Sequence, residues 1–194
     1  PVSEHIKLLL TIQKDPVSGK IYTAAFLRNG CDDIFKSAVI SEKQFVATTL
    51  EDCVRVRIEF INHIYAIFKE VHDYNTGKSE WADQKSLQTY MFDSFEWELL
   101  NELLIEGLKD PLTAEKSLAL FFYFHSENLL INEKHPEIEA TFPVVIIINV
   151  IRDLFALPIP VAYQLADVLD VFNSITGKKF TYSPMEYFTF KLSN

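Results

Sequence analysis

The sequence is poor in cysteine and glycine, and it holds no glycosylation signal. Its two cysteines, Cys31 and Cys53, have no Cys-x-x-Cys partner, which argues against a zinc ribbon and against a disulfide scaffold. Asn-x-Ser/Thr sequons, which mark surface loops of secreted proteins, do not occur. Isolated reduced cysteines are typical of a reducing compartment, and we therefore expect a cytoplasmic protein.

Long hydrophobic runs are also missing. The most apolar window, residues 142–151, is interrupted by Asn149 and closed by Arg152 and Asp153. It is far shorter than the roughly 20 apolar residues that a membrane-spanning helix needs. The first residues lack the basic region and the small-residue cleavage site of a signal peptide. We therefore expect neither a membrane segment nor secretion.

No complete motif for catalysis or cofactor binding is present. Gly77-Lys78-Ser79 matches the end of a phosphate-binding loop, but His72 stands where that loop needs another glycine. Metal-dependent phosphohydrolases use pairs such as His72 and Asp73, yet the further ligands that they need have no distinctive spacing here. Neither a Gly-x-Ser-x-Gly elbow nor a Glu-x-x-His motif occurs. The sequence therefore predicts no cofactor and no metal, and it favours a non-catalytic protein while leaving enzyme activity undecided.

What the sequence does contain is ample material for a hydrophobic core. Of its 194 residues, 48% are hydrophobic and 13% aromatic, which excludes the low hydrophobicity of disordered chains. This length suits one substantial domain, which buries about 70% of its unfolded surface, and it is short for two. No repeat, low-complexity tract or long linker divides the chain. We expect residues 1–194 to form a single domain.

Both ends of the chain carry the pattern of β-hairpins. Residues 6–13 and 20–28 are rich in β-branched, apolar and aromatic residues, and they flank a cluster of turn formers. Residues 179–182 and 185–192 do the same around Ser183-Pro184. Because an isolated hairpin is only marginally stable in water, we expect the two ends to meet in one small antiparallel sheet.

Between the ends, apolar residues recur at the three- and four-residue spacing of helices. Residues 50–73 contain an alternating stretch, 54–60, but the helical spacing continues beyond it and favours a helix. The window after Thr141 is rich in β-branched residues, yet its length also favours a helix over a buried strand. Further helices are expected over residues 84–109, 112–130 and 161–174, the second of them deep in the core because of its aromatic run. The expected fold is α+β, with a core of four or five helices and the small sheet of the two ends.

All of the net charge of −9 lies in one third of the chain. Between Glu80 and Glu139 there are thirteen acidic and four basic residues, while the rest of the chain carries fourteen of each sign. A one-sided charge speeds the capture of an oppositely charged partner and opposes binding to nucleic acid. We therefore expect a basic protein partner and no direct contact with nucleic acid.

Four acidic residues of this segment follow one another at four-residue steps: Glu98, Glu102, Glu106 and Asp110. We refer to these four as the acidic ridge. Like charges at this spacing destabilise a helix by roughly 0.2–0.5 kcal/mol per pair, so a ridge kept in spite of that penalty is a candidate contact surface. Phe95, Trp97 and Leu99 are its candidate apolar anchors. The candidate binding residues are Asp93, Glu96, Trp97, Glu98, Glu102, Glu106 and Asp110.

The sequence favours a non-catalytic binding protein that presents this acidic helical surface to a basic partner. An inhibitor or immunity-type protein, which blocks a nucleic-acid-binding enzyme, needs such a surface because phosphate-binding sites are positive. Two other functions stay open: a structural subunit of a larger assembly, and a metal-dependent hydrolase that uses His72 and Asp73. The acidic ridge also has a simpler interpretation, as a solvated face or as acids paired internally with Arg55, Arg57 or the C-terminal lysines. The sequence gives neither the identity of the partner nor the oligomeric state.

Overall fold

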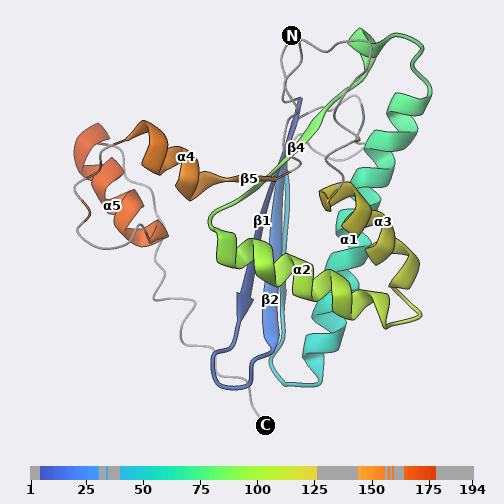
Figure 1. Cartoon of the computed structure of the whole chain (residues 1–194), viewed down its shortest axis with the longest axis horizontal. Coiled ribbons are helices and arrows are strands. Elements are labelled where there is room, and N and C mark those ends of the chain that lie inside the picture. The colour runs from blue at the N-terminus through green and yellow to red at the C-terminus, as the bar shows by residue number, and fades with distance from the viewer. Residues whose placement is uncertain are drawn as a thin grey trace.

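A computed structural model of the chain describes residues 5–30, 34, 40–125, 144–155, 157, 159 and 164–177 (Figure 1). These residues form an α+β fold, as the sequence predicts, but their sheet differs from the expected one. It has five strands and mixes parallel with antiparallel pairs, so the prediction of a small antiparallel sheet made only of terminal hairpins is corrected. The expected C-terminal hairpin, residues 179–192, lies outside the described residues.

The strands of the described sheet are β1 (Ile6–Lys14), β2 (Ile21–Asn29), β3 (Ile40–Val46), β4 (Leu87–Met91) and β5 (Val144–Ile146). They lie in the order β3-β2-β1-β4-β5. β2 runs antiparallel to β1 and β3, whereas β4 runs parallel to β1 and β5 parallel to β4. β1 is therefore the middle strand, and it joins an antiparallel half of the sheet to a parallel half.

The β1–β2 hairpin confirms the prediction for residues 6–13 and 20–28. Its turn is closed by Asp15, whose carboxylate accepts a hydrogen bond from the Ser18 N–H at 2.7 Å. Gly19 has a φ of 67°, a conformation that favours glycine, and its N–H donates to the Asp15 carbonyl at 2.9 Å. The turn formers of the sequence thus fix the pairing of β1 with β2.

The described helices are α1 (Asp52–Thr76), α2 (Ser94–Leu108), α3 (Ala114–His125), α4 (Ile147–Leu154) and α5 (Leu165–Thr176), with a short 3-10 turn at Trp81–Asp83. α1 confirms the helix expected over residues 50–73, so the alternation within it does not form a strand. α5 ends at Gly177, whose φ of 64° is that of a left-handed helix cap.

Two of the expected helices are instead a strand followed by a helix. In place of one helix over residues 84–109, the chain forms β4 and then α2, with an extended Asp93 between them at a φ of −136°. In the window after Thr141, β5 is followed directly by α4. Both strands are short, and parallel pairing with residues far away in the sequence holds them in the sheet. The β-branched residues of β5 are a local strand signal, but the length of the apolar window outweighed it, and the residues of β4 fit the helical spacing of α2.

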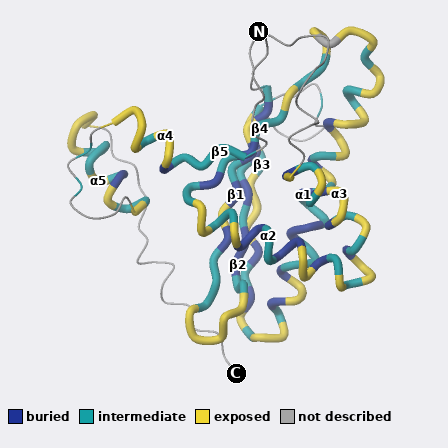
Figure 2. Tube along the Cα trace, viewed as in Figure 1, coloured by how far each residue is buried: buried dark blue, intermediate teal, exposed yellow. Residues whose placement is uncertain are grey.

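The core lies between one face of the sheet and the helices α1, α2 and α3 (Figures 1 and 2). Alternate side chains of β1 point into it and are buried: Ile6, Leu8, Leu10 and Ile12. Lys7 and Thr11 point to the other face and are exposed, as the two-residue period of a strand requires. Phe60 of α1 and Leu100 and Leu103 of α2 complete the same cluster.

α1, α2 and α3 meet at Gly107. A Cβ atom at this position would lie 2.2 Å from Ser117 Oγ of α3 and 2.6 Å from Ile61 Cδ1 of α1. Only glycine allows so close an approach of the three helices. The Thr113 hydroxyl donates to the Gly107 carbonyl at 2.9 Å and closes the turn between α2 and α3. These contacts hold α2 and α3 together as a helical hairpin on α1.

α4 and α5 lie beyond β5, on the side of the molecule away from α1 and α3 (Figure 1). They pack on each other through Phe155 and Phe172, whose ring centroids are 5.6 Å apart. Among the described helices, none combines the length and the apolar character that crossing a bilayer requires.

Candidate functional site

Asp93 and Glu96 hold the first turn of α2 in place. Asp93 is the N-cap, and its carboxylate accepts a hydrogen bond from the Glu96 N–H at 2.8 Å. The Glu96 carboxylate accepts from the Phe92 N–H at 2.9 Å and from the Thr11 hydroxyl at 2.5 Å. Burial raises the pKa of Glu96, although these hydrogen bonds favour its charged form. Asp93 therefore caps α2, and Glu96 joins α2 to β1.

This joint lies where β1 extends beyond its neighbour. β4 pairs with β1 only from Ile6 to Leu9, whereas β1 continues to Lys14. Thr11 lies in the extension, so Glu96 bonds to β1 at a place where no β4 residue faces it. Asp93 and Glu96 also have the Asp-x-x-Glu spacing of a capping box, a sequence signal that marks the start of α2.

The apolar anchors of α2 differ from the expected ones. Trp97 is half-buried against α3, with its ring centroid 6.1 Å from that of Phe124 and 5.2 Å from that of His125. Leu99 is 2% exposed and belongs to the core. Of the three expected anchors, Phe95 alone is well exposed, at 56%. Ile105, at 45%, joins it on the outward side of the helix.

The fold brings two cations from distant parts of the chain to the acidic ridge. Lys14 of β1 donates to both oxygens of Glu102, at 2.7 and 2.9 Å, across a sequence separation of 88 residues. Arg57 of α1 contacts Asp110 at 2.9 Å. The pKa of Asp110 is lowered, first by the hydrogen bond from the Leu112 N–H and then by Arg57. Internal pairing is thus confirmed for Asp110 with Arg57, whereas the pairing of Glu102 with Lys14 left no signal in the sequence.

The other two acids of the ridge differ from each other. Glu106 accepts a hydrogen bond at 2.6 Å from Lys109, which follows it on the same helix and lowers its pKa. Glu98 is exposed, and we find no partner for it among the described residues. The repulsion along the ridge is therefore offset at three of its four positions, and Glu98 is the ridge acid that has no partner among the described residues.

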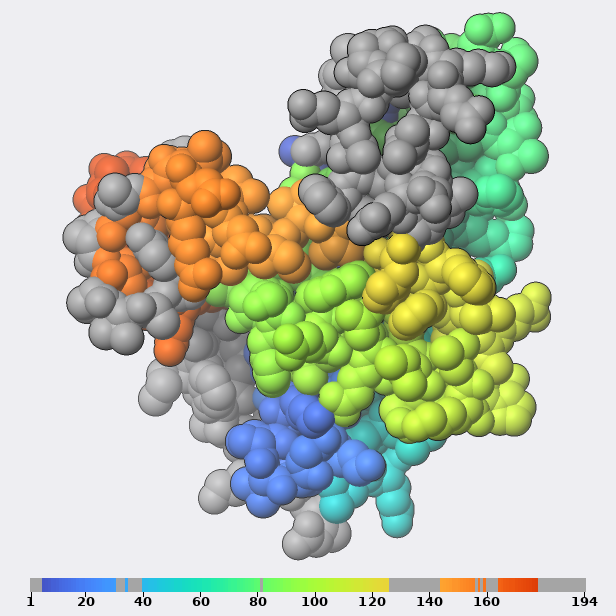
Figure 3. All heavy atoms as spheres, in the orientation of Figure 1, coloured from blue at the N-terminus to red at the C-terminus, as the bar shows by residue number. Residues whose placement is uncertain are grey.

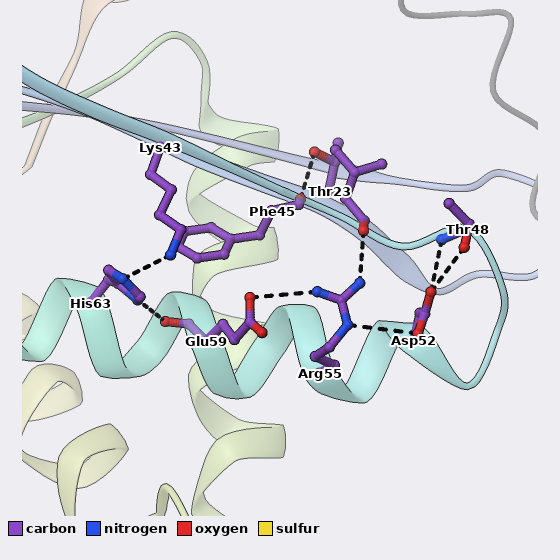
Figure 4. A network of polar contacts seen from close by, with 9 residues as sticks. Thr23, Lys43, Phe45, Thr48, Asp52, Arg55, Glu59 and His63 are labelled. Atoms are coloured by element: carbon purple, nitrogen blue, oxygen red, sulfur yellow. Dashed lines mark hydrogen bonds and ion pairs between the residues drawn. The ribbon is translucent and has the colours of Figure 1, made fainter.

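Arg55, the second arginine considered as a partner for the ridge, pairs with acids of α1 and donates to the Val46 carbonyl of β3 at 3.1 Å. It contacts Asp52 at 3.6 Å and Glu59 at 3.5 Å (Figure 4). In the same network, His63 Nδ1 donates to the Glu59 carbonyl at 2.8 Å, so its Nε2 is the atom that accepts from Lys43 of β3, 3.0 Å away. This network packs α1 against β3, and it uses both ring nitrogens of His63.

The pair considered as a metal site, His72 and Asp73, gains no further ligand in the described part of the chain. Asp73 is bonded to Lys69, one turn earlier on α1. The His72 ring lies 3.4 Å from the Thr76 hydroxyl. No group of three or more His, Cys, Asp or Glu side chains that could hold a metal ion occurs among the described residues. Both side chains are exposed on the last turns of α1.

The outward sides of α2 and α3 form the remaining candidate surface. Leu118 and Phe122 of α3 are 45% and 62% exposed, although the aromatic run of this helix predicted deep burial. α3 packs on the outside of α1 and α2, which leaves one of its sides in solvent. Figure 3 shows α2 and α3 next to each other on one face of the molecule. We refer to the following residues as the α2–α3 surface: Phe95, Glu98, Ile105, Leu118 and Phe122.

The α2–α3 surface combines exposed apolar side chains with an acidic one. Its apolar side chains favour burial by another molecule, and the carboxylate of Glu98, which has no partner in the described part of the chain, favours a positive charge there. Comparisons of the chain with protein-family models, with curated proteins and with solved structures found no match in any of the three.

Proposed function

We propose that this chain is a non-catalytic binding protein that presents the outward side of α2 to a basic protein partner. The observation that carries the proposal is the exposure of Phe95 and Ile105 on the same side of α2 as Glu98. Large apolar side chains on the same side as an acid that has no partner among the described residues combine the two components of a protein contact, namely buried anchors and charged surroundings.

The exposed charges of α2 and α3 support a basic partner. Glu98, Glu106 and Glu115 are exposed, whereas Lys116 of α3 is only partly exposed and bonded to Asn62 of α1, and the exposed Lys109, which follows α2, is already bonded to Glu106. Complementary charge mainly speeds association. The same charges repel a phosphate backbone, so the proposal excludes direct binding to nucleic acid.

An inhibitor of a nucleic-acid-binding enzyme is the form of this function that the charge favours. The phosphate-binding surface of such an enzyme supplies the basic partner, and the acidic helix would cover it. A subunit held permanently in a larger assembly would use the same surface. The proposal also places the protein in the cytoplasm, where a free thiol such as that of Cys53 stays reduced.

Photocrosslinking from α2 tests the proposal. The full chain carries p-benzoylphenylalanine in place of Phe95 and is irradiated in native extract. We expect a crosslink to a protein with a basic surface, and we expect its yield to fall in about 0.5 M salt, which screens exposed charges. Adding Glu98→Gln should lower the yield in the same way.

The matched control carries the same crosslinking residue in place of Ile40, an exposed apolar position on β3. Glu42→Gln, on the same strand, controls for the loss of one exposed charge. Equal crosslinking from positions 95 and 40, or a yield that responds neither to salt nor to Glu98→Gln, contradicts the proposal.

A further inference from the structure

We infer that the contacting element of the partner is a basic amphipathic helix, which docks lengthwise on the α2–α3 surface. Its apolar side chains face Ile105, Leu118 and Phe122, and its lysines and arginines face the exposed acids. This inference rests on the proposed function, and it adds the shape and the residue pattern of the element that binds.

α2 and α3 form a hairpin, and we place the docking helix on the outward side of this hairpin, away from α1. Gly107 touches Ser117 near the turn, and Trp97 packs on Phe124 at the opposite end. α2 and α3 therefore run antiparallel and stay in contact along their length. The side chains of two such helices form ridges and grooves in which another helix packs. Amphipathic helices bind complementary apolar surfaces through residues spaced three, four and seven apart.

Apolar side chains are exposed on α3 as well as on α2. Leu118 and Phe122 are four residues apart, so they lie one turn apart on the same side of α3. Leu112, which is 69% exposed, adds an apolar side chain at the turn that joins the two helices. Because this exposure spans two helices and the turn between them, it offers a docking helix contacts over several turns.

Charge decides which kind of helix fits. Among the described residues, Glu98 and Glu115 have no partner, so each is available to a lysine or arginine of the docking helix. Lys109 is bonded to Glu106 and does not offer a free positive charge to an acidic ligand. An acidic amphipathic helix, or an anionic lipid surface, would place like charges against these glutamates. A basic helix is therefore the occupant that both the apolar and the charged side chains favour.

Three synthetic peptides of about 20 residues test the inference by fluorescence anisotropy with the full chain. The first carries leucines at helical spacing with lysines elsewhere, the second has the same composition without helical period, and the third has glutamate in place of lysine. We expect the first to bind at least about tenfold more tightly than the other two. Leu118→Ser combined with Phe122→Ser should weaken its binding about tenfold. Val17→Ser, at a 93% exposed position of the β1–β2 turn, is the matched control and should have no effect.

Thermal melts of the same variants check that the fold is intact. We expect unchanged midpoints because Val17, Leu118 and Phe122 are all exposed. If both lysine peptides bind equally well and Glu98→Gln weakens both, the inference of a helical element is wrong, and the proposal of a basic partner is still supported. If the glutamate peptide binds as tightly as the first lysine peptide, both the helical element and the basic partner are contradicted. If neither lysine peptide binds, the inference is wrong, and the crosslinking from position 95 decides the proposed function by itself.

Discussion

Among single residues, Glu96 shows how a candidate binding acid becomes part of the fold. Its carboxylate lies between α2 and β1, bonded to the Phe92 N–H and the Thr11 hydroxyl. Burial outweighs these bonds, so the pKa of Glu96 is raised above its ordinary value of 4.5. The folded protein therefore binds a proton at Glu96 more tightly than the unfolded chain does.

This shift predicts the sign of a pH effect. The stability gained by protonating Glu96 is fully present below pH 4.5, and it is lost as the pH rises through the raised pKa of the folded protein. Glu96→Gln cannot titrate. Relative to this variant, the free energy of unfolding of the wild type should fall between pH 4.5 and neutral pH. The fall should be about 1.4 kcal/mol for each unit by which the pKa is raised.

Urea unfolding of both proteins over a series of pH values measures this difference, and taking a difference cancels the titration of every other group. Thr11→Val provides a second variant, because it removes one hydrogen bond to the carboxylate and should raise the pKa of Glu96 further. If the free energy of unfolding of the wild type, relative to that of Glu96→Gln, stays constant or rises with pH, burial does not govern the pKa of Glu96.

At the scale of elements, those with local signals could be predicted and those held by distant residues could not. The turn formers between β1 and β2, the long helical spacing of α1 and the glycine after α5 are all local. β4 has no such signal, because Leu87 and Tyr90 fit the helical spacing that continues into α2. Their place in the sheet depends on pairing with Ile6 and Leu9 of β1.

The candidate site was predictable to a similar extent. The sequence indicates Phe95 and Glu98 as candidates, and the helical spacing of α2 adds Ile105, which lies on the same side of the helix. It could not show that Lys14 reaches Glu102, because that contact depends on how α2 crosses β1. The aromatic run of α3 misled the prediction of burial for Phe122. The amount of surface that a helix exposes is set by its neighbours and not by its composition alone.

These pairings predict that two neutralising substitutions, one turn apart on α2, have different effects on stability. Glu102→Gln removes the partner of Lys14 in a pair of which neither side chain is fully exposed. We expect its free energy of unfolding to fall by up to about 1 kcal/mol. Glu98→Gln removes only a repulsive neighbour, so stability should stay level or rise by roughly 0.2–0.5 kcal/mol.

Thermal melts at low salt compare the two variants. In a Lys14→Met background the loss caused by Glu102→Gln should disappear, since the cation that it serves is gone. A larger loss for Glu98→Gln than for Glu102→Gln would mean that the charge of Glu98 is compensated within the fold.

At the scale of the whole molecule, β1 is the strand on which both halves of the sheet depend. β2 pairs with it on one side and β4 on the other. Leu8 lies at this junction, opposite Arg28 and Thr89, and is completely buried in the core. Leu9 points to the opposite face of the sheet and is only partly buried. Adjacent leucines of one strand thus offer a matched pair of substitutions.

Leu8→Ala should lower the free energy of unfolding by about 2–5 kcal/mol, because it leaves a cavity in the centre of the core. Leu9→Ala should lower it by less.

If residues 1–194 are a single domain, the loss must appear equally in far-UV circular dichroism, which follows all helices, and in the fluorescence of Trp97, which follows the contact of α2 with α3. A Trp81→Phe background restricts the fluorescence to Trp97, since the chain has two tryptophans. Denaturation midpoints that coincide for both probes, and that move together in Leu8→Ala, support one cooperative unit. A second transition in circular dichroism, left in place by Leu8→Ala, would instead assign part of the helices to a unit that folds without β1.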